Sequence, residues 1–410
     1  MEVRPGYKQT EVGVIPEDWQ VCRLGELGKL EMGKGLLKGD ISSFGDFPAI
    51  PYTSLYTDLS EVVERENIKW FVDKNNASYV VNSPCVLLAS SSNVSANTGK
   101  ACALADGFPV AVGREVITLT TKQNVIFISY LLGTNAYRKK TLDSAKGITI
   151  KHVYPTTFVN YTIALPPAPE QSAIATALSD MDALLDGLDR LIAKKRAIKQ
   201  ATMQQLLTGQ TRLQGFSEEW EVKTLGDIVE RFVGGGTPSR ANPEYWGDEI
   251  PWVTVKDFAT FNPFQAQESI TKLGLQNSAT NLIPAGTLIT STRMALGKTV
   301  LYQVDVTINQ DLKALFLKPE VNIYFLLHWF AYHGGRIDDI GSGSTVKGIS
   351  VNELKRLEII IPREAEQTAI ATVLSDMDTE IVALETRRTK TRALKQAMMQ
   401  ELLTGRTRLV

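Results

Sequence analysis

Two stretches of the chain carry apolar residues at alternating steps of four and three, with polar residues between them. These positions are Ile174, Leu178, Met181, Leu185, Leu188 and Ile192 in the first stretch, and Ile370, Leu374, Met377, Ile381 and Leu384 in the second. This spacing places one apolar stripe along one face of an α-helix and is typical of a coiled coil. We therefore predict two long helices that pack together along these residues.

The residues at both ends of each stretch support this prediction. Prolines at 166, 167 and 169 precede the first stretch and Pro362 precedes the second, as expected at a helix start. Gly209 and Gly405 each follow Leu-Leu-Thr, where a left-handed C-terminal cap favours glycine. Each helix would run for about 39 residues, or roughly 58 Å at 1.5 Å per residue. Basic residues gather on both stretches, and we expect them to form a solvated face: Lys194, Lys195, Arg196, Lys199, Arg387, Arg388, Lys390, Arg392 and Lys395.

The two stretches are copies of one another. When residues 169–213 are aligned on 365–409, about 27 of 45 positions are identical, including Ser-Asp-Met-Asp and Leu-Leu-Thr-Gly in both. Weaker echoes precede each copy: a tryptophan at 19 and 220, and Lys-Gly-Ile at 146–148 and 347–349. The chain is therefore ordered as head, long segment, head, long segment. We predict a first head at 1–165, a spacer at 166–213, a second head at 214–362 and a second spacer at 363–410.

Each head has short apolar runs of both kinds. Residues 85–89, 109–112, 115–119 and 288–290 are typical of strands, and 125–133 and 323–333 of helices. Strands and helices do not alternate regularly enough for a doubly wound sheet, so we predict two α+β heads of mixed helix and strand.

Composition and charge narrow the possible classes. The chain has 410 residues, of which 43% are hydrophobic and 22% charged, which excludes wholesale disorder. Lys+Arg number 44 against 45 Asp+Glu, so any basic surface must be local. Cys22, Cys85 and Cys102 lack metal-site spacing and fit a reducing cytoplasm. The start carries no apolar signal segment, and the longest apolar stretch, 323–332, is shorter than the roughly 20 residues that cross a bilayer. We expect no contact with a membrane.

A catalytic constellation is missing from the sequence. His152, His328 and His333 form no ligand spacing, and the last two are expected to pack inside a helical run. There is no GxxxxGK[ST] phosphate loop and no GxSxG elbow. The glycine run at 232–236 is expected to form a turn, and Asn262-Pro263-Phe264, which lacks the second proline of the amino-methyltransferase motif, a loop. We predict no catalytic residue, no metal and no cofactor on this chain.

At these residues the chain resembles the DNA-specificity subunits of type I restriction–modification enzymes. The resemblance covers essentially the whole length and is most specific in the helical repeats, which begin with Glu-Gln shortly after a proline (Pro167 with Glu170, Pro362 with Glu366) and end with Leu-Leu-Thr-Gly. The second head carries further segments that are similar to those of the family. These are residues 235–239 (GGTPS), 245–246 (YW), 250–252 (IPW), 291–293 (STR) with 297–298 (GK), 308–311 (INQD), and 341–345 (GSGST) before Lys347. The first head departs from this pattern, with Gly33-Lys34-Gly35 and 90–93 in place of these pieces.

The resemblance implies a fold, partners and a division of labour. Each head would read one half of a split, asymmetric site in double-stranded DNA, and the helices would pair antiparallel with pseudo-twofold symmetry and hold the heads apart. Two modification subunits and the restriction/translocase subunits would complete the enzyme. S-adenosylmethionine, ATP and Mg would then bind to those partners, and this subunit would catalyse nothing.

Base readout requires side chains that match donor and acceptor patterns in the grooves. Polar, glycine-punctuated loops carry such side chains in both heads. In the first head they are Lys34, Lys38, Ser91, Asn93, Asn97 and Lys100; in the second head they are Thr237, Ser239, Arg240, Arg293, Lys298, Asn309, Gln310 and Lys347. The aromatic residues Tyr245, Trp246 and Trp252 are expected in the core.

Two other functions fit the same sequence. The chain could be a coiled-coil adaptor whose heads bind protein or glycan, or a fused methyltransferase or nuclease with scattered catalytic residues. Salt-sensitive, sequence-selective binding to a bipartite duplex would exclude the adaptor. Methyl transfer by the chain alone would identify an enzyme.

Overall fold

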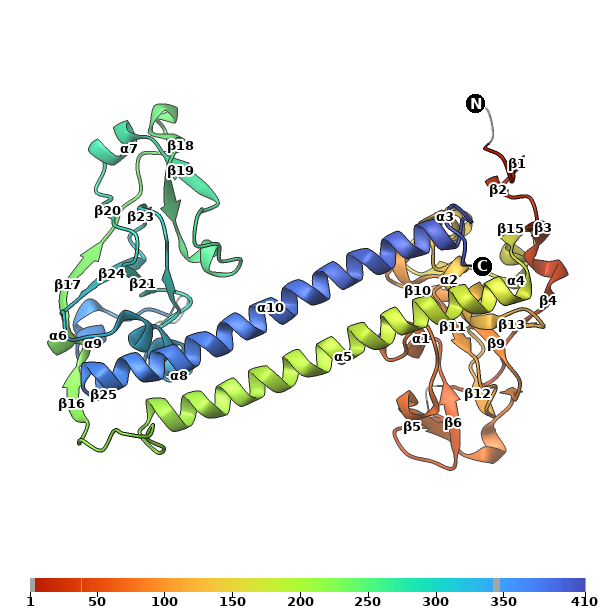
Figure 1. The fold of residues 1–410 in the computed structure, drawn as a ribbon, viewed down its shortest axis with the longest axis horizontal. Coiled ribbons are helices and arrows are strands. Elements are labelled where there is room, and N and C mark those ends of the chain that lie inside the picture. The colour runs from red at the N-terminus through yellow and green to blue at the C-terminus, as the bar shows by residue number, and fades with distance from the viewer. Residues whose placement is uncertain (1–3, 38, 342–346, 410) are drawn as a thin grey trace. The chain divides into compact units, whose positions relative to one another are not determined.

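The computed structural model describes residues 4–37, 39–341 and 347–409, and the chain divides into two compact units. Unit 1 comprises Met1–Asp189 and Thr386–Val410, and unit 2 comprises Arg190–Glu385. The long helices α5 (Ala168–Leu207) and α10 (Glu364–Leu402) each contribute to both units (Figure 1). They are 40 and 39 residues long, which confirms the two predicted helices. Each unit therefore holds one head and a segment of each long helix.

The heads are built from short strands and helices. In unit 1 these are β1 (Tyr7–Thr10), β2 (Gly13–Pro16), β3 (Gln20–Arg23), β4 (Gly28–Met32), β5 (Ile41–Ser42), β6 (Phe47–Ile50), α1 (Ser54–Thr57), β7 (Trp70–Val72), β8 (Val80–Val81), β9 (Cys85–Ala89), β10 (Ser91–Ser92), β11 (Ala101–Leu104), β12 (Val110–Val112), β13 (Val116–Thr121), α2 (Val125–Leu132), α3 (Asn135–Ser144), β14 (Lys151–His152), α4 (Pro155–Val159) and β15 (Thr162–Leu165). In unit 2 they are β16 (Glu221–Thr224), α6 (Leu225–Ile228), β17 (Val229–Gly234), β18 (Trp246–Val253), β19 (Glu268–Ile270), α7 (Lys272–Gln276), β20 (Leu282–Ile283), β21 (Leu288–Ser291), β22 (Thr299–Leu301), β23 (Val306–Ile308), β24 (Leu312–Leu317), α8 (Ile323–Ile340), α9 (Val351–Lys355) and β25 (Glu358–Ile361).

Both heads have the same sheet topology. An antiparallel sheet has the order β11-β9-β13-β4 in unit 1 and β22-β21-β24-β17 in unit 2. A second sheet has the order β7-β6-β12-β8, with β5 added outside β7, in unit 1 and β19-β18-β23-β20 in unit 2. In each second sheet the central pair is parallel, β6 with β12 and β18 with β23. The α+β prediction is confirmed, and one topology underlies two head sequences that have little in common.

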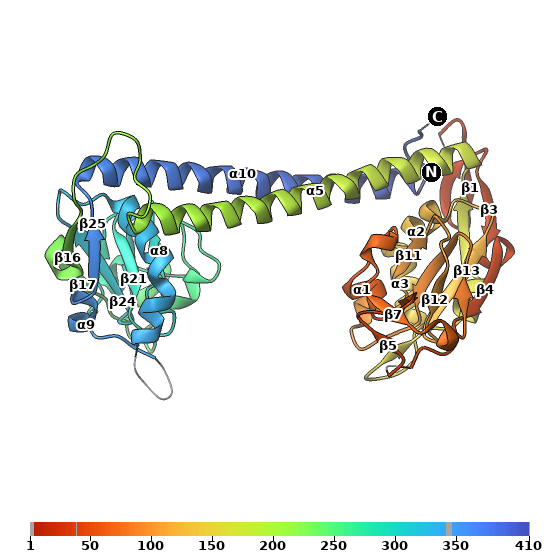
Figure 2. The same cartoon turned by 90° about the horizontal axis from the view of Figure 1, so that it is seen from below.

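Because successive side chains of a strand point to opposite faces of the sheet, each head has two hydrophobic cores, one on each face of its antiparallel sheet. In β9, Val86 and Leu88 face the core that contains α2, whereas Leu87 faces the second sheet. In β24, Leu315 packs with α8 and Ala314 packs with the second sheet. Figure 2 shows α8 lying against β21 and β24. This period-two pattern buries both faces of the antiparallel sheet, so its exposed chemistry is confined to the loops at its ends.

A buried glutamate near the start of each long helix joins three segments of its unit. In unit 1, Glu170 is fully buried and accepts hydrogen bonds from Trp19 Nε1 (2.9 Å) and from Arg408 Nε (2.6 Å). Unit 2 repeats this network with its own residues. Glu366 is 3% exposed and accepts from Trp220 Nε1 (3.1 Å) and Arg212 Nε (2.6 Å).

The arginines come from the far ends of the opposite helices. Arg408 follows α10 and contacts the start of α5, and Arg212 follows α5 and contacts the start of α10. Leu402 and Leu403 belong to the core of the first head, and Leu206 and Leu207 to the core of the second. Each head is therefore completed by the helix that follows the other head.

Ion pairs show that α5 and α10 run antiparallel within each unit. In unit 1, Asp182 pairs with Lys395 and Asp189 with Arg388 (2.7 Å). In unit 2, Lys199 pairs with Asp378, the equivalent of the Asp182–Lys395 pair.

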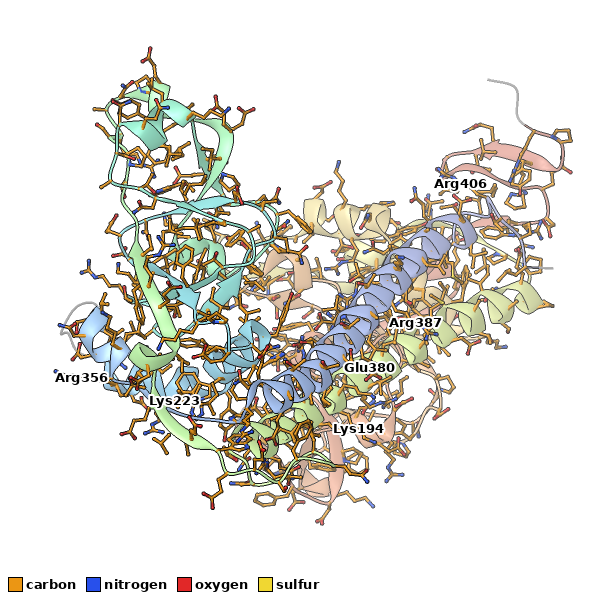
Figure 3. All side chains as sticks on the ribbon, turned by 60° about the vertical axis from the view of Figure 1, so that its left-hand side comes forward. Lys194, Lys223, Arg356, Glu380, Arg387 and Arg406 are labelled. Atoms are coloured by element: carbon orange, nitrogen blue, oxygen red, sulfur yellow. The ribbon has the colours of Figure 1, made fainter. Side chains whose placement is uncertain are left out.

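More of the basic residues on these helices form such pairs. Lys195 pairs with Glu380 (2.7 Å) and Arg196 with Glu385. The predicted solvated face is therefore wrong for Lys195 and Lys199, which are half-buried where opposite charges on the two helices meet, whereas Arg196 keeps 62% of its side chain exposed. Lys194 on α5 and Arg387 on α10 remain exposed, as predicted (Figure 3).

Three local predictions can be compared with the structure. Gly209 and Gly405 both have φ of +70°, which confirms the left-handed caps. The glycine run at 232–236 does not form a turn throughout, because β17 continues to Gly234 and pairs with β24. The Lys-Gly-Ile match between 146–148 and 347–349 aligns residues that are not structurally equivalent. Gly348 pairs with Arg293, and the residue that makes the corresponding pair in the first head, with Ser91, is His152 and not Gly147.

The buried glutamates can be tested one at a time. Glu366→Gln keeps the shape of the side chain and removes the charge that Arg212 and Trp220 contact. We expect a loss of about 2 kcal/mol in the stability of unit 2, as for hydrogen bonds to charged groups. Hydrogen exchange of β16 and β25 should accelerate about 30-fold. The matched control is Glu364→Gln, two residues away and exposed; equal exchange rates in the two variants would contradict this role.

Candidate nucleic-acid interface

Residues predicted to contact DNA gather at one edge of the antiparallel sheet in the second head. Thr237 follows β17, Gln310 precedes β24, and Arg293 lies between β21 and β22. The strand register brings these points together, because Gly234 pairs with Lys313 and Ser291 with Leu312. The end of β17, the start of β24 and the end of β21 therefore meet at the same edge.

Direct contacts link these side chains. Thr237 Oγ1 donates to Gln310 Oε1 (2.8 Å), and both residues are exposed. Arg293, whose side chain is 58% exposed, lies 3.5 Å from Asp311 Oδ1. The backbone N–H of Met294 donates to the carbonyl of Lys347 (3.1 Å), which joins the loop before α9 to this edge. Thr237, Arg293, Gln310 and Lys347 thus form one exposed group of donors and acceptors.

Other predicted residues of the second head have internal partners. Asn309 is only 7% exposed; its Oδ1 accepts from the Asp311 backbone N–H (3.1 Å), and its Nδ2 donates to the Asp311 carboxylate (3.3 Å). Asn309 therefore positions Asp311, which in turn holds Arg293. The Lys298 ammonium donates to the carbonyl of Phe258. The Lys347 ammonium lies 2.9 Å from Asp338, and this hydrogen bond raises the pKa of Lys347.

Arg240 and Ser239 lie where the chain leaves this edge toward the second sheet. The Arg240 guanidinium lies 3.7 Å from the ring centre of Trp246 and donates to both carboxylate oxygens of Glu268 (2.5 and 2.8 Å). This contact raises the pKa of Arg240 and lowers that of Glu268. The Ser239 carbonyl accepts from Trp246 Nε1 (3.2 Å). An exposed arginine is therefore held flat and fixed by an aromatic ring and an acid.

Of the three aromatic residues expected in the core, one lies fully inside. Trp252 is 3% exposed and donates to the Gly236 carbonyl (2.9 Å). Tyr245 and Trp246 are half-buried, and the guanidinium of Arg240 covers the ring of Trp246.

The first head presents the equivalent edge with different residues. Lys34 follows β4, Asn93 and Asn97 lie between β10 and β11, and Lys100 precedes β11. Lys34 and Asn93 are exposed and Asn97 is half-buried. Lys100 turns inward, where its ammonium donates to the Leu59 carbonyl (3.2 Å). Ser91 is fully buried and donates to the Glu115 carboxylate, and Lys38 lies outside the described residues.

The sequence did not reveal that β14 also belongs to this edge. Lys151 and His152 pair with Ser92 and Ser91, next to Asn93. The pairing of Arg293 with Gly348 in the second head makes Lys151 the equivalent of Lys347. The Lys-Gly-Ile echo pointed to Lys146 instead, since a sequence match cannot detect a shift in strand pairing.

Over residues 4–37, 39–341 and 347–409, no three His, Cys, Asp or Glu side chains gather as a metal site. Burial raises the pKa of the Cys85 and Cys102 thiols to about 12, which leaves them protonated and unreactive. Burial also lowers the pKa of His328 to about 4, and its Nε2 lies 3.1 Å from Ser375 Oγ. Among the helices of the described residues, none contains an uninterrupted apolar stretch that could span a lipid bilayer.

Comparison with known proteins identifies the same family in both halves of the chain. The family model "Type I restriction modification DNA specificity domain" matches residues 16–198 and 217–393. A putative type I restriction enzyme MjaX specificity subunit from Methanocaldococcus jannaschii is 24% identical over 98% of this chain and 97% of its own length.

Further relatives match part of the chain or its fold. The MjaIX specificity subunit of the same organism is 33% identical, but the alignment spans only 38% of that relative and 39% of this chain. The EcoR124I/EcoR124II specificity subunit from Escherichia coli is 30% identical over 53% of this chain and 55% of that protein. The crystal structure of a type I restriction–modification S subunit from M. genitalium shares the fold, with a TM-score of 0.62 at 14% identity over 98% of both chains. Since the family model matches both repeats, the chain belongs to the family of type I restriction–modification DNA-specificity domains.

Proposed function

We propose that this chain is the sequence-specific DNA-recognition subunit of a type I restriction–modification enzyme, and that each head reads one half of a bipartite, asymmetric site. The observation that carries the proposal is that both heads share one topology and present unlike side chains at the same sheet edge. Lys34 and Asn93 lie at the edge in the first head, and Arg293 and Gln310 in the second. Equivalent scaffolds with unlike reading groups suit an asymmetric target.

The chemistry of the edge fits duplex DNA. Arginine and lysine match the acceptors of guanine, and glutamine and asparagine match adenine. Several cations in the second head are held by acids, such as Arg293 by Asp311 and Lys347 by Asp338. These acids keep the cations in place without DNA, and the chain as a whole has a net charge of −1. Phosphates of the duplex would compete with the acids for the same cations, which makes binding sensitive to salt.

The helix pair supports a role as a scaffold for two modification subunits. The Asp182–Lys395 pair of unit 1 recurs as Asp378–Lys199 in unit 2, so the helices offer nearly equivalent surfaces to two copies of one partner. Restriction/translocase subunits would join this assembly. S-adenosylmethionine, ATP and Mg would bind to the partner subunits. Specificity subunits are non-catalytic, and the free thiols, of which Cys85 and Cys102 are buried, suit the reducing cytoplasm where the assembly would act.

Two substitutions in the second head test the proposed contacts. Gln310→Ala should weaken binding to the cognate duplex by about 10- to 100-fold and relax selection at one base pair, because a base-reading amide is lost. Arg293→Ala should also weaken binding if its guanidinium leaves Asp311 for DNA. The matched control is Lys318→Ala, which removes a cation beyond the other end of β24. The measurement is fluorescence anisotropy with the assembled methyltransferase at fixed salt; equal affinities for all three variants would overturn the assignment of this edge.

Exchange of the reading part of one head tests whether the heads act independently. Residues 28–121 and 146–153 carry both sheets of the first head and the loop of β14, and they leave in place Trp19 and Asn124, whose side chains contact the start of α5. Replacement of these segments by their counterparts from another family member should change one half of the methylated sequence only. The readout is the map of methylated bases in host DNA. A change in both halves would refute independent heads, and methylation without any partner subunit would refute the non-catalytic role.

A further inference from the structure

We propose that Ile148 of the first head is an apolar wedge that inserts between stacked base pairs of the bound duplex, which rests on the function proposed above. Ile148 is 98% exposed, more than any other large apolar side chain in the described part of the chain. Single exposed aliphatic residues are common, so exposure alone indicates little. Three further features of Ile148 indicate a ligand: its position in the head, the hydrogen bonds that hold its loop, and the basic residues around it.

The loop that carries Ile148 is held firmly at its base. The backbone N–H of Lys146 donates to the His152 carbonyl (2.9 Å), and that of His152 donates to the Lys146 carbonyl (2.8 Å). Gly147 begins the tip with φ of +109°. Beyond the base, Val153 is 1% exposed and its N–H donates to the Ser90 carbonyl (2.8 Å). The tip is therefore a short protrusion anchored in the core, and little conformational freedom would be lost when it inserts.

The charge around the tip favours a polyanion. Residues 138–151 include five basic side chains and one acidic side chain. Lys146 and Lys151 flank the tip, whereas Arg138 turns inward and donates to the Thr98 carbonyl (2.8 Å). An aliphatic side chain between two lysines suits a duplex, because the cations can contact phosphates on either side of the base step that the wedge opens.

The loop also lies at the edge where the first head is proposed to read DNA. β14 pairs with β10, which places the base of the loop beside Asn93. In the second head the residue equivalent to Val153 is Ile349, which is 5% exposed, and the sequence ahead of it at 341–345 is Gly-Ser-Gly-Ser-Thr. Counted back from Ile349, the sequence position that corresponds to Ile148 is a serine, Ser344, whereas Val346 corresponds to Ile150. The wedge therefore belongs to the half-site of the first head.

The test uses the assembled methyltransferase and the recognition sequence mapped by methylation. Duplexes carry 2-aminopurine, whose fluorescence rises when it is unstacked, at each position in turn of the half-site read by the first head. The wild type should raise the fluorescence at one base step. Ile148→Ala should abolish this rise and weaken binding about 10- to 30-fold, as expected for loss of a buried aliphatic group. The slope of affinity against salt should not change, because no phosphate contact is removed.

Control variants separate the wedge from other roles of the loop. Ile148→Leu should retain the fluorescence rise. Val80→Ala removes a 42% exposed aliphatic group from β8, on the second sheet of the same head, and should behave as the wild type. Wild-type fluorescence and affinity in Ile148→Ala would overturn the wedge and leave the proposed function intact. Loss of modification subunits from Ile148→Ala would also overturn it, in favour of a protein contact. Absence of any sequence preference in the wild-type complex would refute the proposed function itself.

Discussion

A buried carboxylate near the start of each long helix is the constraint on which the rest of this structure depends. Glu170 and Glu366 are almost fully excluded from water, so each needs charged and polar donors to offset its desolvation. A tryptophan from the neighbouring head and an arginine from the end of the opposite helix supply them. This requirement fixes which helix end lies against which head. It also explains why Glu-Gln, Leu-Leu-Thr-Gly and the following arginine are identical in both repeats.

The glutamine that follows each glutamate extends the same constraint into the heads. Gln171 Oε1 accepts from the backbone N–H of Asn124, and Gln367 Oε1 from that of Asn322. Each asparagine caps the helix that covers its sheet, α2 or α8. The orientation of each sheet relative to its own helix segments is thus set by a few polar groups that both repeats retain. The loops at the sheet edge take no part in this network and are free to differ.

Recognition by such loops depends on side chains that are already in position. Arg240 rests on Trp246 and is held by Glu268, and Asp311 is oriented by Asn309 before it contacts Arg293. Fixed donors lose less conformational entropy when they bind, and a wrong base leaves them without partners. Selectivity of this kind relies on local geometry and not on a strongly basic chain.

The sequence by itself determined the features that depend on local pattern. The heptad-like spacing from Ile174 to Ile192 fixed a helix, and the glycines at 209 and 405 fixed its caps, because both effects act within a few turns of backbone. The duplication and the repeat motifs identified the family. The strand-like runs at 85–89 and 288–290 and the lack of regular alternation gave the α+β class.

Only the tertiary structure decided how distant residues are used. Ser91 and Asn309 have the same hydrogen-bonding groups as an exposed side chain that reads a base. Both are nevertheless buried, because Ser91 is hydrogen-bonded to Glu115 and Asn309 to Asp311. Lys-Gly-Ile occurs in both heads, but strand pairing makes Lys151 and not Lys146 the equivalent of Lys347. The exposure of Ile148 and the contact of Arg408 with Glu170, 238 residues away, are likewise invisible to local pattern. Burial and pairing are non-local quantities, so a donor has no visible partner until the chain has folded around it.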